Sequence, residues 1–276
     1  MTKILYAKDY VDKKMGRLIE KVKKLKSKPI LSTIRVGDDY GSIAYEKGIK
    51  KTADKLGVDV DSNEFKEDVM EDEVIERIKK LNDDEKVGGI IIFRPLPENF
   101  DEEKISLAID PKKDVDCMHP INRARVFSGD VSGFTPLAPK AAYELLKFYG
   151  YELRGKDTVI INHSNVVGKP LMMYLLRDLA TVTICHVGTV DLKKHTRSAE
   201  IIFTAMGRAE TLDASYFNED AIVIDIGTSK NSEGKYRGDL DEKSVKGKIK
   251  AYSPVPGGIG SITNLLLIEN VINFYE

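Results

Sequence analysis

Apolar residues in the first half of the chain alternate between helical and strand-like spacing. An opening amphipathic helix places Tyr10, Met15, Leu18, Ile19 and Val22 on one face. Beyond it, the pattern predicts strands at residues 30–36, 58–60 and 89–93, and helices at residues 42–56, 71–81 and 102–109. We expect Ser42 to cap the helix at 42–56 and Gly57 to end it. This alternation is typical of an α/β domain with parallel strands.

The second half begins with a loop-like segment at residues 110–139, which contains several Pro, Gly and Asp residues. A helix is predicted after it, at residues 140–149. Short apolar strands then follow at residues 158–162, 181–186, 201–205, 221–226 and 250–252. A Gly- and Pro-rich loop at residues 254–260 precedes a last helix at 263–275. Five parallel strands spaced by helices describe a doubly wound sheet.

Composition narrows the class of protein. A chain of 276 residues with 42% hydrophobic residues can build two modest cores. Its 43 basic and 44 acidic residues nearly cancel, which favours a small-molecule ligand over nucleic acid or a membrane surface. Two cysteines and an amino terminus without the apolar core of a signal peptide predict a reducing, cytoplasmic location. The histidines and cysteines lack metal-ligand spacing, so we expect no metal site.

The turn after the strand at 158–162 is a candidate cofactor site. It contains Asn162, His163, Ser164 and Gly168 and leads into an apolar helical run. A helix start at the carboxyl end of a parallel strand suits a pyrophosphate. The G-x-G-x-x-G fingerprint is not met, however, and an ordinary strand-to-helix connection explains the pattern about equally well. Gly207 and Gly227 follow later strands and would let a flat cofactor lie over the same edge.

Two residues of the first half are candidates on position alone. Tyr45 lies on the helix at 42–56, where a lone tyrosine usually belongs to a core rim. Asp116 lies with Asp114 in the loop-like segment, where a solvated turn is the default interpretation. No G-x-S-x-G elbow occurs, which argues against an α/β-hydrolase.

Several motifs together resemble one known family. They are Val36-Gly37-Asp38-Asp39 with Ser42 and Tyr45, Pro95-Leu96-Pro97, Lys113-Asp114-Val115-Asp116 with His119-Pro120, Ser164-Asn165-Val166-Val167-Gly168-Lys169-Pro170, and Pro254-Val255-Pro256-Gly257-Gly258-Ile259-Gly260. The chain resembles the methylenetetrahydrofolate dehydrogenase/cyclohydrolase family over nearly its whole length. The resemblance implies two α/β domains, the second a Rossmann-like doubly wound parallel sheet, with a folate cleft between them, NAD or NADP on the second domain, and a homodimer.

By that resemblance, a folate-binding and catalytic domain would comprise residues 1–136 and the C-terminal helix 263–276, and an NAD(P)-binding domain residues 137–262. Tyr45 would stack on the folate and Asp116 would hydrogen-bond the pterin edge, both as catalytic residues. The remaining implied substrate-binding residues are Pro95, Leu96, Pro256, Gly257 and Gly258. The implied cofactor-binding residues are Asn162, His163, Ser164, Val187, Gly207, Gly227, Thr228 and Gly258.

Two departures from the family concern its second activity, the hydrolysis of the methenyl product. The family's lysine four residues after the tyrosine is Ile49 here, and its glutamine before Pro-Leu-Pro is Phe93. Neither side chain can transfer a proton, which that hydrolysis requires. Cyclohydrolase activity is therefore lost or weakened, unless Lys47 or Lys50 replaces the missing group; the alternative is a full bifunctional enzyme.

The cofactor turn departs as well. The family's Gly-Arg-Ser is Asn162-His163-Ser164, and its His-Ser-Arg/Lys is His186-Val187-Gly188. Loss of these contacts to a ribose phosphate favours NAD slightly, although a protonated His163 would still meet a phosphate. Two rival hypotheses are a shikimate-type or amino-acid dehydrogenase sharing only the second domain, and a folate- or nucleotide-binding protein without catalysis.

Overall fold

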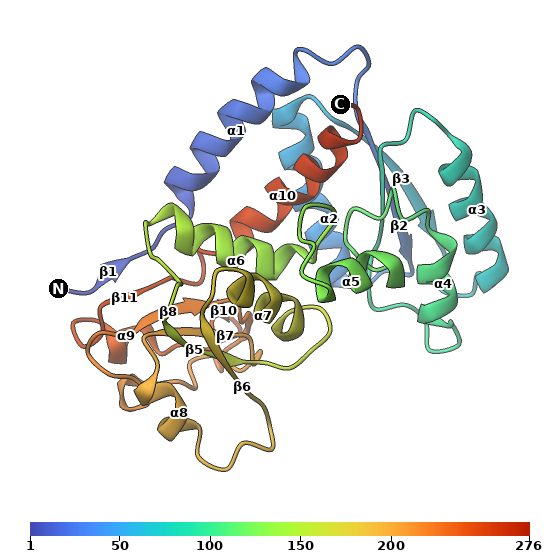
Figure 1. Ribbon diagram of the computed structural model, residues 1–276. Coiled ribbons are helices and arrows are strands. Elements are labelled where there is room, and N and C mark those ends of the chain that lie inside the picture. The colour runs from blue at the N-terminus through green and yellow to red at the C-terminus, as the bar shows by residue number, and fades with distance from the viewer. The chain divides into compact units, whose positions relative to one another are not determined.

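The computed structural model describes all 276 residues. Figure 1 shows the ribbon, in which the chain divides into two compact units. The six-stranded unit comprises Met1–Asp12, Val126–Gly129 and Pro136–Thr263, and the three-stranded unit comprises Lys13–Arg125, Asp130–Thr135 and Asn264–Glu276. The first twelve residues differ from the predicted division, because β1 (Lys3–Ile4) pairs with β11 (Ala251–Tyr252) in the larger sheet.

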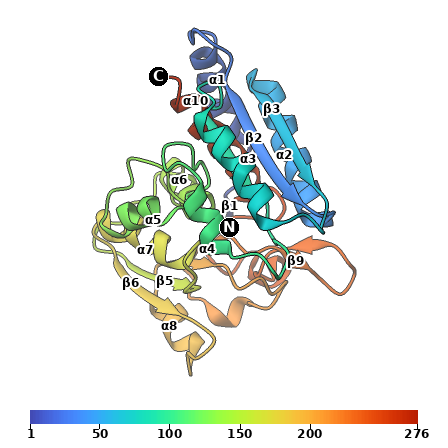
Figure 2. The ribbon, with the colours of Figure 1, turned by 90° about the vertical axis from the view of Figure 1, so that its right-hand side faces the viewer.

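The three-stranded unit is built on a parallel sheet of order β3-β2-β4. Its strands are β2 (Ile30–Val36), β3 (Asp59–Phe65) and β4 (Gly89–Ile92). Its helices are most of α1 (Lys8–Val22), α2 (Tyr40–Leu56), α3 (Glu71–Asp83), α4 (Glu102–Ala108), most of α5 (Pro120–Phe127) and most of α10 (Gly260–Asn273). Figures 1 and 2 show α2 on one face of the sheet and α3 on the other. Both faces are thus covered, as parallel sheets require.

Apolar side chains from β2 and β4 pack against α3 and α4 to form one core of this unit. Ile34, Ile90 and Ile92 supply the sheet side, and Val74, Ile78 and Ile105 supply the helix side. All of these side chains are buried. This face of the sheet is therefore apolar.

The six-stranded unit is a parallel sheet of order β1-β11-β8-β7-β5-β6. Its remaining strands are β5 (Asp157–Ile161), β6 (Thr181–Cys185), β7 (Ile201–Thr204) and β8 (Ile222–Asp225), and its helices are α6 (Leu137–Phe148), α7 (Gly168–Arg177), α8 (Leu192–Ser198) and α9 (Glu242–Val245). The strand order reverses next to β5, which confirms the predicted doubly wound fold.

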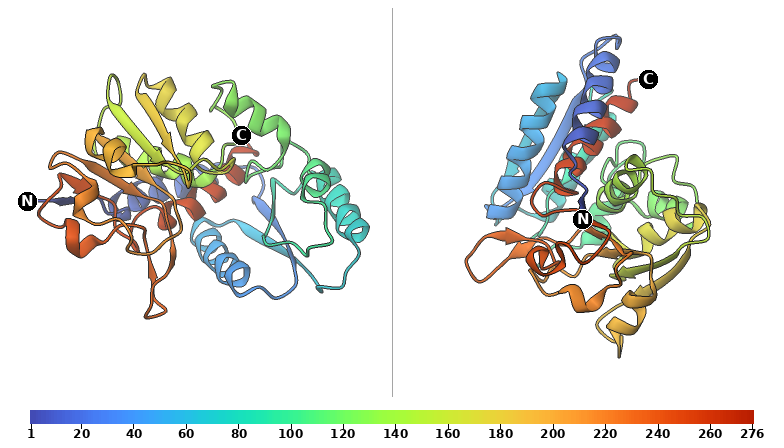
Figure 3. Two further views of the ribbon diagram at one scale, coloured as in Figure 1. Left: turned by 90° about the horizontal axis from the view of Figure 1, so that it is seen from below. Right: turned by 90° about the vertical axis from the view of Figure 1, so that its left-hand side faces the viewer.

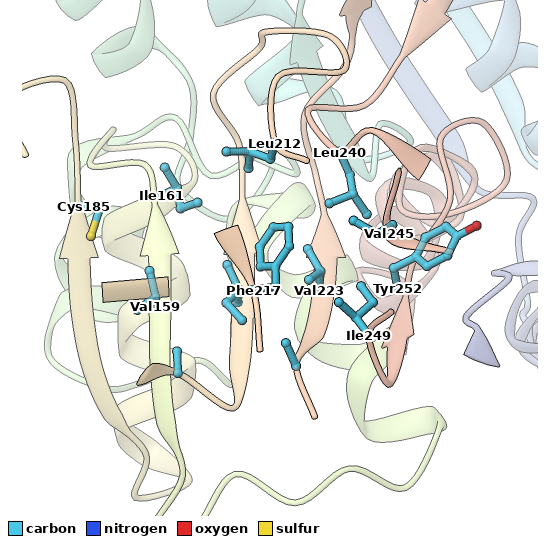
Figure 4. Packing of buried hydrophobic residues seen from close by; sticks show 13 residues of the cluster. Val159, Ile161, Cys185, Leu212, Phe217, Val223, Leu240, Val245, Ile249 and Tyr252 are labelled. Carbon is cyan, nitrogen blue, oxygen red and sulfur yellow. The ribbon is translucent and has the colours of Figure 1, made fainter. Parts of the chain in front are cut away.

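Figure 4 shows the core on one side of this sheet. Val159, Ile161 and Val223 project from the strands toward Phe217 and Leu212. Figures 2 and 3 show that the antiparallel hairpin β9 (Ser229–Lys230) and β10 (Tyr236–Arg237) extends from this unit. The chain after β10 returns to this unit, where Leu240 forms a parallel bridge with Leu212.

The structure corrects several predicted details. Asp39, not Ser42, caps α2: its carboxylate accepts a hydrogen bond from the Ser42 amide at 2.7 Å. Gly57 does end that helix, with a left-handed φ of 72°. The segment predicted to be loop-like contains α5, which begins at Pro120 in the position that proline favours. No helix of the structure is long and apolar enough to cross a membrane.

Candidate functional site

Polar groups gather at the carboxyl edge of the three-stranded sheet. Tyr45 lies on α2, which follows β2, and Phe93 and Pro95 come directly after β4. The chain before Asp116 runs parallel to β4, with Ile90 bridged to Asp114. Parallel strands end at the same edge of a sheet. The segments that follow β2 and β4, and the segment paired with β4, therefore bring these four residues to that edge.

Tyr45 packs edge-on against Phe93, with ring centres 5.8 Å apart and an angle of 79° between the rings. The start of α2 is tied to the same place, because the Ser42 hydroxyl donates a hydrogen bond to the Arg94 carbonyl at 2.9 Å. Burial raises the pKa of the Tyr45 phenol, and the charge of Asp116 raises it further. The phenol stays protonated, and the structure gives its oxygen no hydrogen-bond partner within the chain.

Asp114 and Asp116 have opposite surroundings. The Asp114 carboxylate accepts hydrogen bonds from the amides of Met118 and His119 and from the Asn122 side chain, at 2.8, 2.8 and 2.9 Å. The Asp116 carboxylate accepts none from the chain and is partly exposed. Asp114 therefore holds the turn together, and Asp116 is available to a ligand.

The enclosure of Asp116 changes its ionisation. Burial raises the pKa of its carboxyl to about 7, and the neighbouring Asp114 charge acts in the same direction. Arg94 and Arg123 oppose both effects. The Arg123 Nε is buried and has no hydrogen-bond partner, and one terminal nitrogen of its guanidinium contacts the Met118 sulfur at 3.6 Å. A carboxyl that titrates near neutrality suits a recognition or catalytic role.

Lys113, which belongs to the motif around Asp116, has a structural role instead. Its ammonium donates hydrogen bonds to the carbonyls of Leu81, Asn82 and Asp84, at 3.0, 2.7 and 2.7 Å. These carbonyls lie at the end of α3, where backbone acceptors lack partners within the helix. Burial lowers the pKa of Lys113, and the carbonyl bonds offset the loss of water.

The two lysines considered as substitutes do not lie with Tyr45. The Lys50 ammonium forms an ion pair with Glu46 at 2.9 Å, and Glu46 is buried among further partners that include Arg35 at 3.3 Å and Ser62 at 2.9 Å. Lys47 is exposed. Ile49, one turn after Tyr45, is 0% exposed. The face of α2 that carries Tyr45 is thus apolar at the next turn.

The loop at residues 254–260 lies in the six-stranded unit and approaches its own backbone closely. Gly257 has a φ of +107°, which side chains rarely adopt, and its carbonyl accepts a hydrogen bond from the Ala7 amide at 2.9 Å. A Cβ at Gly258 would lie 2.5 Å from the Pro254 carbonyl oxygen. These glycines are required by the shape of the loop, whatever else they bind.

A cavity of about 390 Å³ lies at the carboxyl edge of the six-stranded sheet. It is lined by the residues that follow β5, β6 and β7, among them Asn162, His163, His186, Val187, Met206 and Arg208. Its volume is within the usual range for small-molecule sites, and its position beside the reversal of strand order is where such sheets bind nucleotides. Of the expected cofactor residues, Asn162, His163 and Val187 line it, whereas Ser164, Gly207, Gly227, Thr228 and Gly258 do not.

Asn162 shapes the turn after β5. Its side-chain oxygen accepts hydrogen bonds from the amides of Ser164 and Gly168, at 2.8 and 3.0 Å, and its side-chain nitrogen donates to the Ala205 carbonyl at 2.7 Å. A Cβ at Gly168 would lie 2.0 Å from the Asn162 carbonyl oxygen. The glycine is thus needed for close packing of the α7 start on the turn.

The cavity has a basic lining that the sequence only partly indicated. The His163 and His186 rings lie 5.2 Å apart, centre to centre. Arg208 was not predicted, although the neighbouring Gly207 was, because Arg208 belongs to no recognised motif. No acidic side chain is among the lining residues, so the cavity suits an anionic ligand. No group of three or more potential ligands could hold a metal ion.

Comparison with protein families places both halves of the chain in one family. Residues 5–116 match the tetrahydrofolate dehydrogenase/cyclohydrolase catalytic domain. Residues 136–276 match the NAD(P)-binding domain of the same family. The rival hypothesis of a dehydrogenase sharing only the second domain is therefore wrong.

Individual members of this family are similar to the chain over its whole length. The chain is 44% identical to the bifunctional protein FolD of Clostridium botulinum, covering 100% of this chain and 99% of the relative. The solved bifunctional enzyme FolD of Campylobacter jejuni is 37% identical, with a TM-score of 0.96 over 100% of this chain and 99% of the other. The bifunctional dehydrogenase/cyclohydrolase of Thermoplasma acidophilum is 32% identical, with a TM-score of 0.92 over 99% and 97%. The chain therefore belongs to the tetrahydrofolate dehydrogenase/cyclohydrolase family.

Proposed function

We propose that this protein oxidises 5,10-methylenetetrahydrofolate to 5,10-methenyltetrahydrofolate with a nicotinamide cofactor and has lost most of the following hydrolysis step. The observation that carries the proposal is the contrast around Tyr45. Tyr45 and Asp116 offer polar atoms without partners in the chain, whereas Ile49 and Phe93 are apolar and buried.

Tyr45 and Asp116 are suited to hold a reduced pterin. The Tyr45 ring, braced by Phe93 at 5.8 Å, offers a flat apolar surface for stacking. The unpartnered Asp116 carboxylate would accept hydrogen bonds from the pterin amino group and ring N–H, which are donors. Pro95 and Leu96, in the same unit as Tyr45 and Asp116, would border the same substrate.

The cavity at the end of β5, β6 and β7 fits a nicotinamide cofactor, whose chemical contribution is to accept a hydride from the methylene carbon. His163 and Asn162 would contact its phosphate and ribose groups through imidazole and amide atoms. The loss of a hydride generates a cation stabilised by the adjacent folate nitrogens, so this step needs alignment rather than a general base. The protein's task is to hold the two reactants in register.

Hydrolysis of the methenyl product makes a different demand, because attack by water requires proton transfer to and from positioned groups. Around Tyr45, neither Ile49 nor Phe93 can supply one. Lys50 is held by Glu46 at 2.9 Å, on the neighbouring face of α2, and Lys47 is exposed. These contacts support a dehydrogenase with little cyclohydrolase activity, although the named relatives are bifunctional.

We propose NAD as the preferred cofactor. The residue that discriminates a ribose hydroxyl from a ribose phosphate normally follows the second strand of such a domain, here β6. The residues between β6 and β7 that line the cavity are His186, Val187, Thr189 and Leu192, with no lysine or arginine among them. Arg208 follows β7, on the opposite side of β5 from β6. We also propose that the enzyme is a homodimer, which light scattering of the purified chain tests.

The proposal is tested by following reduced-cofactor absorbance with methylenetetrahydrofolate and either NAD or NADP. We expect folate-dependent reduction, faster with NAD, and a loss of at least tenfold in kcat/KM in both Y45A and D116A, by the usual value of a stacked ring or a charged hydrogen bond. A matched control is Y236A, whose tyrosine lies on the β9–β10 hairpin and should leave the rate unchanged. No reduction with either cofactor would contradict the proposed dehydrogenase.

A further inference from the structure

Two buried carboxyl groups behind the cofactor cavity have no role in the proposed reaction. Asp225 is the last residue of β8 and is 1% exposed, and Asp239 follows the β9–β10 hairpin and is 0% exposed. Burial of an acidic group is costly unless hydrogen bonds or a proton compensate it. Their contacts indicate what they hold in place.

Asp239 fixes the turn after β7. One carboxylate oxygen accepts hydrogen bonds from the Thr204 hydroxyl and the Met206 amide, at 2.7 and 2.6 Å. The other accepts from the Arg208 amide at 2.8 Å. The chain from Thr204 to Arg208 thus wraps around one carboxylate, and Ala205, Met206 and Arg208 are the part of it that lines the cavity.

Asp225 in turn fixes the segment that carries Asp239. Its carboxyl oxygens accept hydrogen bonds from the amides of Gly227 and Leu240, at 3.0 and 2.9 Å. The two turns also pack so closely that a glycine in each leaves no room for a side chain. A Cβ at Gly227 would lie 2.3 Å from the Asp239 carboxyl carbon, and a Cβ at Gly238 would lie 2.1 Å from an Asp225 oxygen.

From this geometry we infer that Asp225 and Asp239 are positioning residues for the nicotinamide cofactor, Asp239 as a carboxylate and Asp225 as a neutral acid. Asp239 accepts three hydrogen bonds from donors, which a carboxylate does best. The groups facing the Asp225 carboxyl are the Asp239 carboxylate and the amides of Gly227, Asp239 and Leu240, with no cation among them; the Ser253 hydroxyl bonds the Asp225 backbone. The inference rests on the proposed binding of a nicotinamide cofactor in the cavity.

The ionisation of the pair agrees with this assignment. Burial, followed by the charge of Asp239, raises the pKa of Asp225 to about 8. Below pH 8 the two buried carboxyls carry one negative charge, on Asp239. Above pH 8, a second charge appears between the interlocked turns and pushes them apart. The cavity wall should then lose the shape that binds the cofactor.

The test measures the dissociation constant of NADH by fluorescence between pH 7 and 9, which needs no folate turnover. For the wild type we expect a rise of about tenfold, as one ionisation with a midpoint near 8 predicts, and for D225N less than about twofold, because Asn cannot ionise. For D239N we expect binding about tenfold weaker at pH 7, from the lost acceptor, with kcat at saturating cofactor changed by less than about threefold.

Control variants separate positioning from general stability. D220N removes an exposed carboxylate from the same unit and should bind NADH like the wild type at every pH. T204V removes one donor to Asp239 and should weaken NADH binding in the same direction as D239N but less, so the test stands even if D239N does not fold. A flat wild-type profile, a D225N profile that still rises, or folded T204V and D239N with wild-type affinity would overturn the inference. NADH binding without folate oxidation would contradict only the proposed function.

Discussion

Asp114 and Asp116 lie two residues apart, yet Asp114 accepts three hydrogen bonds from the chain and Asp116 accepts none. The turn that Asp114 organises leaves the Asp116 carboxyl enclosed beside Tyr45 without a partner. Enclosure of a carboxyl raises the free energy of its charged form, which is why its pKa rises to about 7. This relationship gives the folate site a measurable dependence on pH.

Folate affinity should fall as the pH is lowered through 7. The carboxylate form of Asp116 accepts the pterin hydrogen bonds, and this form is replaced by the neutral acid below its pKa of about 7. For one ionisation, KM for methylenetetrahydrofolate should rise roughly eightfold between pH 7.5 and 6. D116N should have a higher KM at pH 7.5 and almost no dependence on pH. An unchanged slope in D116N would contradict the assignment.

Restoring polar groups beside Tyr45 should restore hydrolysis. In the double variant I49K/F93Q, we expect methenyl hydrolysis at least about a hundredfold faster than in the wild type, the lower end of the usual gain from general acid–base catalysis. A lysine at a position that is 0% exposed also lowers the free energy of unfolding, so thermal unfolding is measured in parallel. K50M is the control for a lysine already bound to Glu46, and it should not change hydrolysis.

Lys113 should be important for stability. K113M leaves three carbonyls at the end of α3 without their donor and should reduce the free energy of unfolding by about 3 kcal/mol, measured by urea denaturation. The matched control K112M alters the adjacent exposed lysine and should change stability by less than about 0.5 kcal/mol. Equal effects in the two variants would show that the buried contacts contribute little.

Cofactor preference should respond to the residue at position 163. H163R introduces a permanent cation into the lining of the cavity, and we expect the ratio of kcat/KM for NADP to that for NAD to rise about tenfold, the value of a charged hydrogen bond to phosphate. H195R places the same charge on α8, outside the cavity lining, and serves as the control. A similar shift in both variants would attribute the effect to net charge alone.

The regular elements could be predicted because their patterns are local. The buried run at β4 and the helical spacing in α3 carry their signal within a few residues. β1 could not be predicted, since it has two residues and pairs with β11 nearly 250 positions later. The α2 cap was misplaced because Asp39 and Ser42 are both favoured capping residues, and only the structure shows which one accepts the bond.

The chemistry was less predictable than the fold. A sequence that contains Asp114 and Asp116 does not reveal which carboxylate is saturated by the amides of Met118 and His119 and the Asn122 side chain. Nor does it reveal that Asp225 and Asp239 interlock, because the β9–β10 hairpin separates them along the chain. Such properties depend on contacts between distant segments. Ile49 and Phe93, by contrast, could be singled out directly, since an apolar side chain is unable to transfer a proton in any environment.

The proposed loss of cyclohydrolase activity is tested by adding 5,10-methenyltetrahydrofolate to the purified protein without nicotinamide cofactor and following its absorbance. The same preparation is first shown to reduce NAD with methylenetetrahydrofolate. We expect the methenyl compound to decay at the rate measured without protein, because Ile49 and Phe93 cannot transfer a proton and Asp116 binds the pterin. Decay that is many times faster, proportional to protein concentration and abolished in Y45A, would contradict it.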